Sequence, residues 1–257
     1  GLLLAISFPT YDIYWLAWVG FIPLFYVIST VPTPKEAARY AGVTGLAFYG
    51  LTFLFLFSLW EFVGAFILLG WLLLILFYSL YAALFGYLAK RFSFQKFPYL
   101  LIPLFWIFIE WLRSLGPFGL VPSIGYSQVG VSSIIQLVKL TGILGVSFLV
   151  VAINALLAEI LVGKQRVWMK GSLLLIAFLM IASAHRFGAQ QLEGADKVNQ
   201  PGKTITVALI QANFSQKQKL DYQNLPEIQR VHLEMTEKAL RGKPDIIVWP
   251  ETAIPFY

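Results

Sequence analysis

Long apolar segments, separated by short clusters of basic residues, constrain the fold of this chain more than any other feature. Of its 257 residues, 58% are hydrophobic and only 12% are charged, about half the charged fraction of an ordinary soluble domain. A helix needs about 20 apolar residues to cross a bilayer, and several segments reach that length. The sequence therefore predicts a polytopic α-helical membrane bundle over residues 1–189. We expect about seven crossings, the first of them truncated, at residues 1–8, 13–30, 40–59, 62–89, 98–115, within 134–162, and 167–185.

The basic residues indicate the orientation of the bundle. If the loop at residues 32–39 is cytoplasmic and the crossings alternate, eight basic residues fall inside and two outside. The inner ones are Lys35, Arg39, Lys90, Arg91, Lys96, Lys164, Arg166 and Lys170, and the outer ones are Arg113 and Lys139. Membrane proteins concentrate Lys and Arg in cytoplasmic loops, so an odd number of crossings places everything after Arg186 outside. The net charge of +6 is spread over these loops, which argues against nucleic-acid binding.

A small α/β domain is predicted at residues 204–257, behind a polar linker at 190–203. Residues 204–211 are rich in β-branched side chains and predict a buried strand. Apolar residues near helical spacing, followed by the stop signals Arg241 and Gly242, predict a helix over 225–240. A second apolar strand, also expected to be buried, follows at 245–249. Strand, helix and strand make one βαβ unit of an α/β fold.

Glu251 directly follows the end of the second predicted strand. Pro250 lacks an N–H and ends sheet pairing, so the glutamate lies at the carboxyl end of the strand, where open α/β folds place reactive groups. We expect it to be buried against Trp249 and the sheet. Charged residues are also common at strand ends, so position alone fits a loop carboxylate equally well.

Several motifs, in order along the chain, resemble one bacterial family. They are FPTYD at 8–12, EWLR at 110–113, GYSQ at 125–128, GILGVSF at 142–148, LIQAN at 209–213 and WPETAIP at 249–255. Together they are similar to apolipoprotein N-acyltransferases, in which inner-membrane helices precede a periplasmic nitrilase-like domain. The resemblance covers essentially the whole chain. It implies that residues 204–257 begin an αββα sandwich of the carbon–nitrogen hydrolase type, and that the chain is the N-terminal part of a longer protein.

The resemblance also implies a two-step acyl transfer by a Glu–Lys–Cys triad, without metal or cofactor. A cysteine thiolate takes a fatty acyl chain from a phospholipid, and the N-terminal amine of a diacylated apolipoprotein then accepts it from the thioester. Glu251 corresponds to the general base, which a thiol of pKa about 8.5 needs at neutral pH. Because the 257 residues hold no cysteine, we expect this polypeptide alone to be inactive.

Other candidate residues carry less weight. Tyr126 and Gln128, in an outer loop, could bind substrate or dock the α/β domain, and Lys219 follows the 209–213 motif at the family's spacing. Leu220 stands where the family commonly has an aromatic residue, which puts an aromatic substrate contact in doubt. Glu110 and Arg113 lie three apart on one helix face, and their sequence favours an intrahelical ion pair over a headgroup site.

Two further functions stay open from the sequence alone. One is a membrane-tethered nitrilase-like amidase, and the other is a non-catalytic, truncated lipid-binding module. A transporter is disfavoured because the crossings carry few charges and show no inverted pair of broken helices. The expected partners are a phospholipid acyl donor, a diacylated apolipoprotein acceptor and the bilayer itself.

Overall fold

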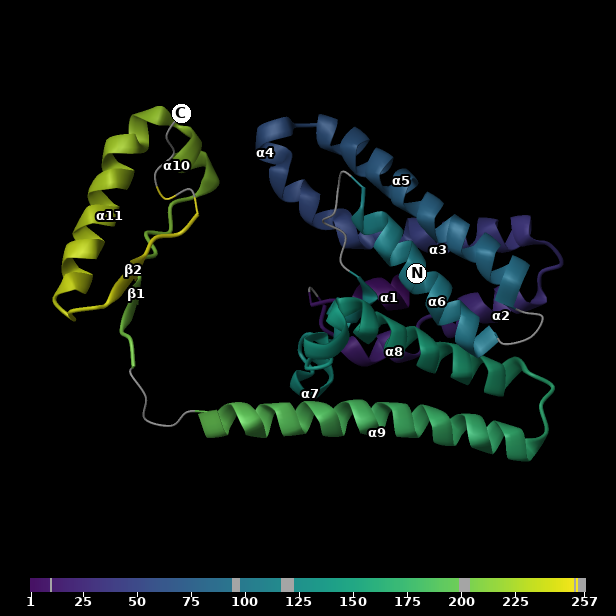
Figure 1. Cartoon of the computed structure of the whole chain (residues 1–257). Helices are drawn as coiled ribbons and strands as arrows, with labels where there is room; N and C mark the ends of the chain where they lie inside the picture. The colour runs from purple at the N-terminus through teal and green to yellow at the C-terminus, as the bar shows by residue number, and fades with distance from the viewer. Residues whose placement is uncertain (10, 94–97, 117–122, 199–203, 252, 254–257) are drawn as a thin grey trace. The chain divides into compact units, whose positions relative to one another are not determined.

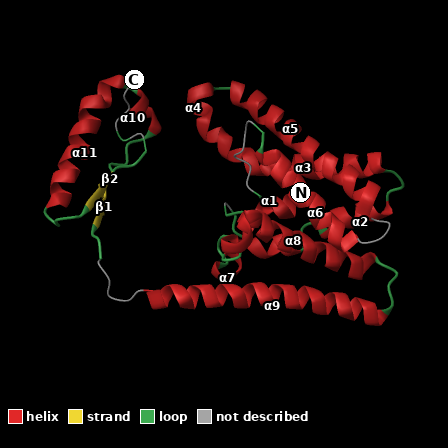
Figure 2. Cartoon of the chain, viewed as in Figure 1, coloured by secondary structure: helices red, strands yellow, loops and turns green. Residues whose placement is uncertain are grey.

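The computed structural model describes residues 1–9, 11–93, 98–116, 123–198, 204–251 and 253. The chain divides into two compact units, Gly1–Asp196 and Lys197–Tyr257, and each is described by itself. The described part of the first unit contains helices and loops (Figures 1 and 2). Its helices are α1 (Leu2–Ile6), η1 (Tyr14–Trp18), α2 (Ile22–Thr30), α3 (Pro34–Thr52), η2 (Phe53–Leu59), α4 (Trp60–Val63), α5 (Phe66–Leu88), η3 (Ala89–Ser93), α6 (Pro98–Ser114), η4 (Ile124–Gln128), α7 (Ser132–Ile135), α8 (Val138–Val162) and α9 (Val167–Val198).

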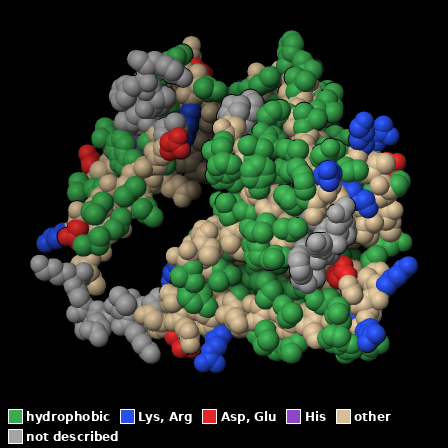
Figure 3. Space-filling model, turned by 45° about the vertical axis from the view of Figure 1, so that its right-hand side comes forward, with side chains coloured by type: hydrophobic (Ala, Val, Ile, Leu, Met, Phe, Trp, Pro, Cys, Tyr) green, Lys and Arg blue, Asp and Glu red, His purple; other side chains and the backbone are tan. Residues whose placement is uncertain are grey.

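Four helical segments of the described chain are long and apolar enough to cross a membrane. They are Pro34–Val63, Phe66–Phe92, Val138–Val162 and Val167–Gly194. Hydrophobic side chains cover much of this unit in the view of Figure 3, as lipid-facing helices require. The protein is therefore a multi-pass helical membrane protein. The structure supports four of the about seven predicted crossings. The apolar segment Tyr14–Thr30 is shorter than these four candidate spans, and α6 has 17 residues. The other crossings therefore stay predictions.

Small residues bring α3 and α5 close together. A Cβ added at Gly86 would lie 2.6 Å from the carbonyl oxygen of Ala37 and 2.5 Å from the Cβ of Ala41. A Cβ at Gly45 would lie 2.8 Å from that of Ala82. Membrane helices associate largely through such close packing, because lipid is as apolar as their side chains.

Helix α8 forms the buried centre of the unit, and α9 packs against it through Leu173 and Ala177. Helix α8 is interrupted after its first turn at Gly142, whose φ of 64° suits a residue without a Cβ. Helix α9 continues to Val198. Part of the segment expected as a linker at 190–203 is therefore helical, because α9 runs about three turns beyond the predicted end of the last apolar run.

The second unit contains a pair of short parallel strands separated by helices. Strand β1 (Val207–Leu209) pairs with β2 (Ile246–Val248) so that Val207 lies opposite Ile246. Between them lie α10 (Gln216–Leu220), η5 (Tyr222–Asn224) and α11 (Leu225–Leu240). The bounds predicted for the long helix are confirmed, and both strands are shorter than predicted.

The expectation that the two predicted strands are buried is wrong for most of their described residues, with the exception of Ile210, which is buried. Leu209 is 75% exposed and Val248 44%, whereas Ala208 and Ile247, which alternate with them, are half-buried. A sheet of two strands leaves its outer side chains in contact with solvent unless another layer covers them. The strand–helix–strand order is thus present, but two short strands do not identify a nitrilase-like sandwich.

Candidate functional site

One tryptophan fixes the strand end that carries Glu251. The indole N–H of Trp249 donates a hydrogen bond to Oγ1 of Thr236 on α11 (3.0 Å). The ring centroid of Trp249 lies 5.3 Å from that of His232, one turn earlier on the same helix. After the strand, the backbone N–H of Ala253 donates to the carbonyl of Pro250 (3.2 Å). Glu251 therefore lies on a turn that directly follows a strand end anchored to α11.

Glu251 itself is exposed, so its expected burial against Trp249 is not found in the described structure. The indole ring faces α11 instead, and no described layer covers the turn. A general base must lie within hydrogen-bond reach of the group that it deprotonates, and an exposed carboxylate is accessible to such a group. The geometry thus gives an accessible carboxylate after an anchored strand end, without showing its reaction partner.

Lys219 lies on α10, a short helix with a well-formed start. Ser215 Oγ accepts the backbone N–H of Gln218, and the Gln218 side chain accepts the N–H of Ser215 in return. This capping box satisfies two N–H groups that a helix start otherwise leaves unpaired. Lys219 is half-buried in the last turn of that helix, on a different element from Glu251.

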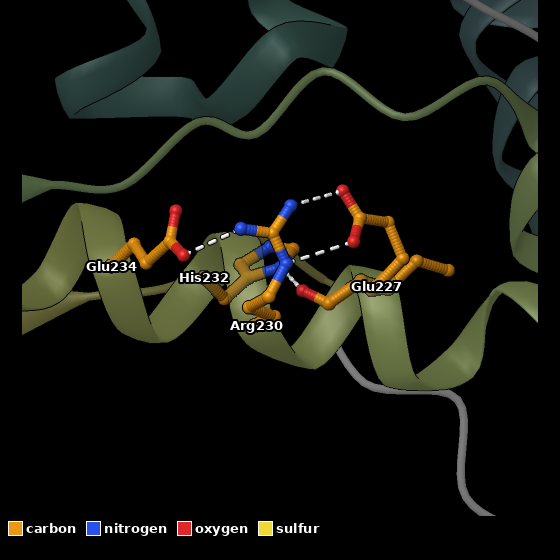
Figure 4. A network of polar contacts seen from close by, with 5 residues as sticks. Glu227, Arg230, His232 and Glu234 are labelled. Carbon is orange, nitrogen blue, oxygen red and sulfur yellow. Dashed lines mark hydrogen bonds and ion pairs between the residues drawn. The ribbon is translucent and has the colours of Figure 1, made fainter.

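The two faces of α11 differ in character. On the exposed face, Arg230 donates hydrogen bonds to Glu227 (2.6 and 2.9 Å) and to Glu234 (2.6 Å) (Figure 4). The hydrogen bond from Arg230 lowers the pKa of Glu227, and both carboxylates raise the pKa of Arg230. On the other face, His232 is buried with Nδ1 2.7 Å from the carbonyl of Ile228. We interpret α11 as a support for Trp249.

Tyr126 and Gln128 both lie on η4 and differ in exposure. Gln128 is fully buried; its carbonyl oxygen accepts the indole N–H of Trp18 (3.0 Å), and its amide donates to the Tyr14 carbonyl (3.1 Å). The side chain of Tyr126 is 44% exposed. The loop therefore presents Tyr126 and is held to η1 through Gln128.

Glu110 anchors the start of the same loop. Its Oε1 accepts hydrogen bonds from the indole of Trp106 (2.8 Å) and the backbone N–H of Ile124 (2.7 Å). Arg113 donates to the hydroxyl of Tyr49 (2.7 Å). The ion pair expected between Glu110 and Arg113 is not formed between these two described side chains, because each is directed to a different buried partner. Oε2 of Glu110 is buried without a hydrogen bond.

The sequence interpretation missed Asn154, a fully buried residue of α8. Its side chain accepts the backbone N–H of Phe21 (3.0 Å) and donates to the carbonyl of Ala17 (2.8 Å). An isolated amide within an apolar membrane segment was the available signal, since such residues are costly and usually paired. Over the described residues, no group of three His, Cys, Asp or Glu could hold a metal ion.

Fold and site together define a class: a multi-pass helical membrane protein whose chain continues into a small α/β unit with an accessible glutamate at a strand end. A family model described as Apolipoprotein N-acyltransferase N-terminal domain matches residues 1–156, more than half of the 257 residues. The chain belongs to this family.

Curated relatives extend the similarity beyond the matched domain. The apolipoprotein N-acyltransferase of Geobacter metallireducens is 32% identical over 272 aligned positions, which cover 100% of this chain and 50% of that protein. That of Chlorobaculum tepidum is 28% identical, covering 100% of this chain and 48% of its own length. That of Pasteurella multocida is 28% identical, covering 99% and 49%. The chain thus spans about half the length of the curated relatives it matches.

Proposed function

We propose that this chain supplies the membrane helices and one catalytic residue of an apolipoprotein N-acyltransferase. The match of residues 1–156 to that family carries the proposal, and similarity over the whole chain supports it. In this proposal residues 1–189 form the inner-membrane domain and 190–203 lead to a periplasmic, nitrilase-like domain that starts at residue 204. The acyl donor is a phospholipid, and the acceptor is the N-terminal amine of a diacylglyceryl-cysteine lipoprotein.

Glu251 is the proposed general base. Its carboxylate accepts the proton of a cysteine thiol, and the thiolate attacks the phospholipid ester to form a thioester. The proton returns to the departing glycerol oxygen, which leaves as a lysophospholipid. In the second step the amine attacks the thioester and forms an amide as the carbon–sulfur bond breaks. The proton of the amine passes through Glu251 to the departing thiolate, which regenerates the thiol and the free carboxylate. The cysteine is absent from the 257 residues, so this polypeptide by itself is proposed to be inactive.

Three further residues belong to the proposal through substrate binding. Tyr126 has the exposure that such a role requires. Lys219 is half-buried and carries a positive charge suited to a phosphate group. Gln128 would have to break its hydrogen bonds to Trp18 and Tyr14 to reach a substrate. Its proposed role is therefore to hold η4, which carries Tyr126, in position.

The test compares two glutamate variants in the product of the complete gene that encodes this chain. Transfer of acyl groups from phospholipid to a diacylglyceryl-cysteine peptide is followed by mass spectrometry. Glu251→Gln should lower the rate at least about 100-fold, the usual contribution of a general base. Glu237→Gln, an exposed carboxylate of α11, should change it less than twofold.

Three outcomes would contradict parts of this proposal. Equal rates for the two variants would show that Glu251 is not the general base. Hydrolysis of simple amides without transfer to the peptide would favour a tethered amidase. Acyl transfer by the 257-residue polypeptide alone would refute its proposed inactivity. We expect the purified polypeptide to carry no covalently bound acyl group.

A further inference from the structure

A cavity of about 510 Å³ lies between α2, α6 and α8. Ligand sites in proteins commonly enclose about 300 to 1,000 Å³. It lies far from the loop that holds Tyr126: Ser147 of α8 bonds the backbone of η4, whereas the cavity is bordered by Glu159, roughly 18 Å further along the helix at 1.5 Å per residue. It is thus separate from the site proposed for acyl transfer.

The lining of the cavity changes from apolar to charged. Its deeply buried lining is apolar and includes Phe25, Ile102 and Ala158, which are 1%, 2% and 7% exposed. Its more accessible lining is polar and includes Lys90 and the exposed Lys164. Such a lining suits a ligand with an apolar body and a charged end.

Among the described residues that line the cavity, positive charges outnumber negative ones. Lys90 donates a hydrogen bond to the carbonyl of Ser29 (3.0 Å), at the C-terminal end of α2. The carboxylate of Glu159 accepts a hydrogen bond from the side-chain amide of Gln165. The described lining therefore contains two lysines and one carboxylate, and that carboxylate already accepts a hydrogen bond. Lys and Arg side chains also gather along the right-hand edge of this unit in Figure 3.

The opening lies where membrane spans end. Lys90 is close to the end of the candidate span Phe66–Phe92, and Lys164 lies two residues after the end of the span Val138–Val162. Lipid headgroups lie at this depth, next to the hydrocarbon core. Basic cavities between membrane helices near a bilayer surface are typical binding sites for phosphate-bearing lipid headgroups.

We propose that this cavity binds the headgroup phosphate of a membrane phospholipid. Lys90 and Lys164 contact the phosphate, while Phe25, Ile102 and Ala158 contact the glycerol ester and first methylenes of the acyl chains. The site does not depend on the acyl-transfer proposal, and it requires neither Glu251 nor the α/β unit.

The experiment measures phosphatidylglycerol bound to the purified, delipidated 257-residue chain by native mass spectrometry. Lys164→Gln should weaken binding about fivefold, the effect of one basic residue at a membrane surface. Ala158→Leu should weaken binding by filling the cavity while all charges stay in place. Lys170→Gln is the matched control, because Lys170 is a basic residue of α9 that does not line the cavity, and it should change binding less than twofold.

Lys164 is exposed, so its substitution tests the proposal even if Ala158→Leu fails to fold. Equal weakening by Lys164→Gln and Lys170→Gln would overturn the phosphate contact, and unchanged binding by a folded Ala158→Leu variant would overturn the location.

Glycerol phosphate and inorganic phosphate, each at millimolar concentration, should not displace the lipid. Displacement by either would show a site for free phosphate instead.

Discussion

Asn154 shows how a single polar side chain connects distant segments inside an apolar bundle. Its oxygen accepts the Phe21 N–H, and its two N–H groups donate to the carbonyls of Ala17 and Val150. Ala17 and Phe21 lie where η1 ends and α2 begins, and helix ends leave backbone groups without intrahelical partners. The side chain of Asn154 thus satisfies backbone groups that lipid could not.

Replacing Asn154 by Leu should therefore destabilise the bundle by roughly 2 to 4 kcal/mol, because it leaves buried groups of Ala17 and Phe21 unpaired. The measurement is thermal unfolding of the purified protein in detergent. Thr44→Val is the control; it removes only a hydrogen bond within α3, from Thr44 to the Tyr40 carbonyl. Equal melting temperatures for the two variants would show that Asn154 is not a structural link.

The ion pairs of Arg230 predict a pH effect confined to acid conditions. The pKa of Glu227 is lower in the folded chain than its ordinary value of 4.5, so the pair contributes stability above about pH 4.5 and loses it as the pH falls through the folded value. Arg230→Gln should move the titration midpoint of Glu227 up toward 4.5, as followed by carbon-13 NMR of labelled glutamate. Because both side chains are exposed, high salt should shrink the difference. An unchanged midpoint would contradict the assigned pairing.

Single polar residues were the hardest part of the structure to predict. The sequence marks both Glu110 and Gln128 as candidates, but one hydrogen-bond partner of Gln128 is Trp18, 110 positions away. Local spacing suggested Arg113 for Glu110, whereas the fold supplied Trp106 and the backbone of Ile124. Hydrogen-bond partners of buried groups are determined by tertiary packing, and the spacing of residues along one helix does not predict that packing.

The glycines of α5 allow a matched test of helix packing. Gly86→Leu should push α3 and α5 apart, because the new Cβ would meet the backbone of Ala37; a loss of roughly 1 to 3 kcal/mol is expected from overpacking. At Gly70, on the same helix, an added Cβ would meet no atom within 4 Å other than its chain neighbours and the backbone of its own helix, so Gly70→Leu is the matched control. It should leave the melting temperature unchanged or raise it, since glycine is a poor helix former. Equal losses for both variants would refute close packing at Gly86.

Elements with strong local signals were predicted well. The helix at 225–240 has Pro226 near its start and Gly242 after its end, and its bounds are confirmed. The long apolar run of α5 likewise predicted a candidate span. Strand burial was predicted wrongly, because the β-branched residues of the segment 204–211 indicate a strand without indicating how many layers cover it.

At the scale of the whole molecule, the orientation in the membrane is open to a direct test. The 257 residues contain no cysteine, so single cysteines can be introduced on an unlabelled background. In intact spheroplasts, a membrane-impermeant maleimide should label Glu237→Cys and not Lys35→Cys, because the basic loops are expected to face the cytoplasm. Both should be labelled after lysis. Labelling of Lys35→Cys in intact spheroplasts would reverse the proposed orientation.

The parallel pairing of β1 and β2 has a consequence for how the protein is made. Thr206 and Asp245, which are joined by a hydrogen bond at the start of the two strands, are 39 positions apart. At about 5 to 20 residues per second, a ribosome needs roughly 2 to 8 s to cover that distance. During this interval β1 emerges with an exposed edge and no partner. The strand is therefore exposed to chaperones and to competing chains for seconds during every round of synthesis.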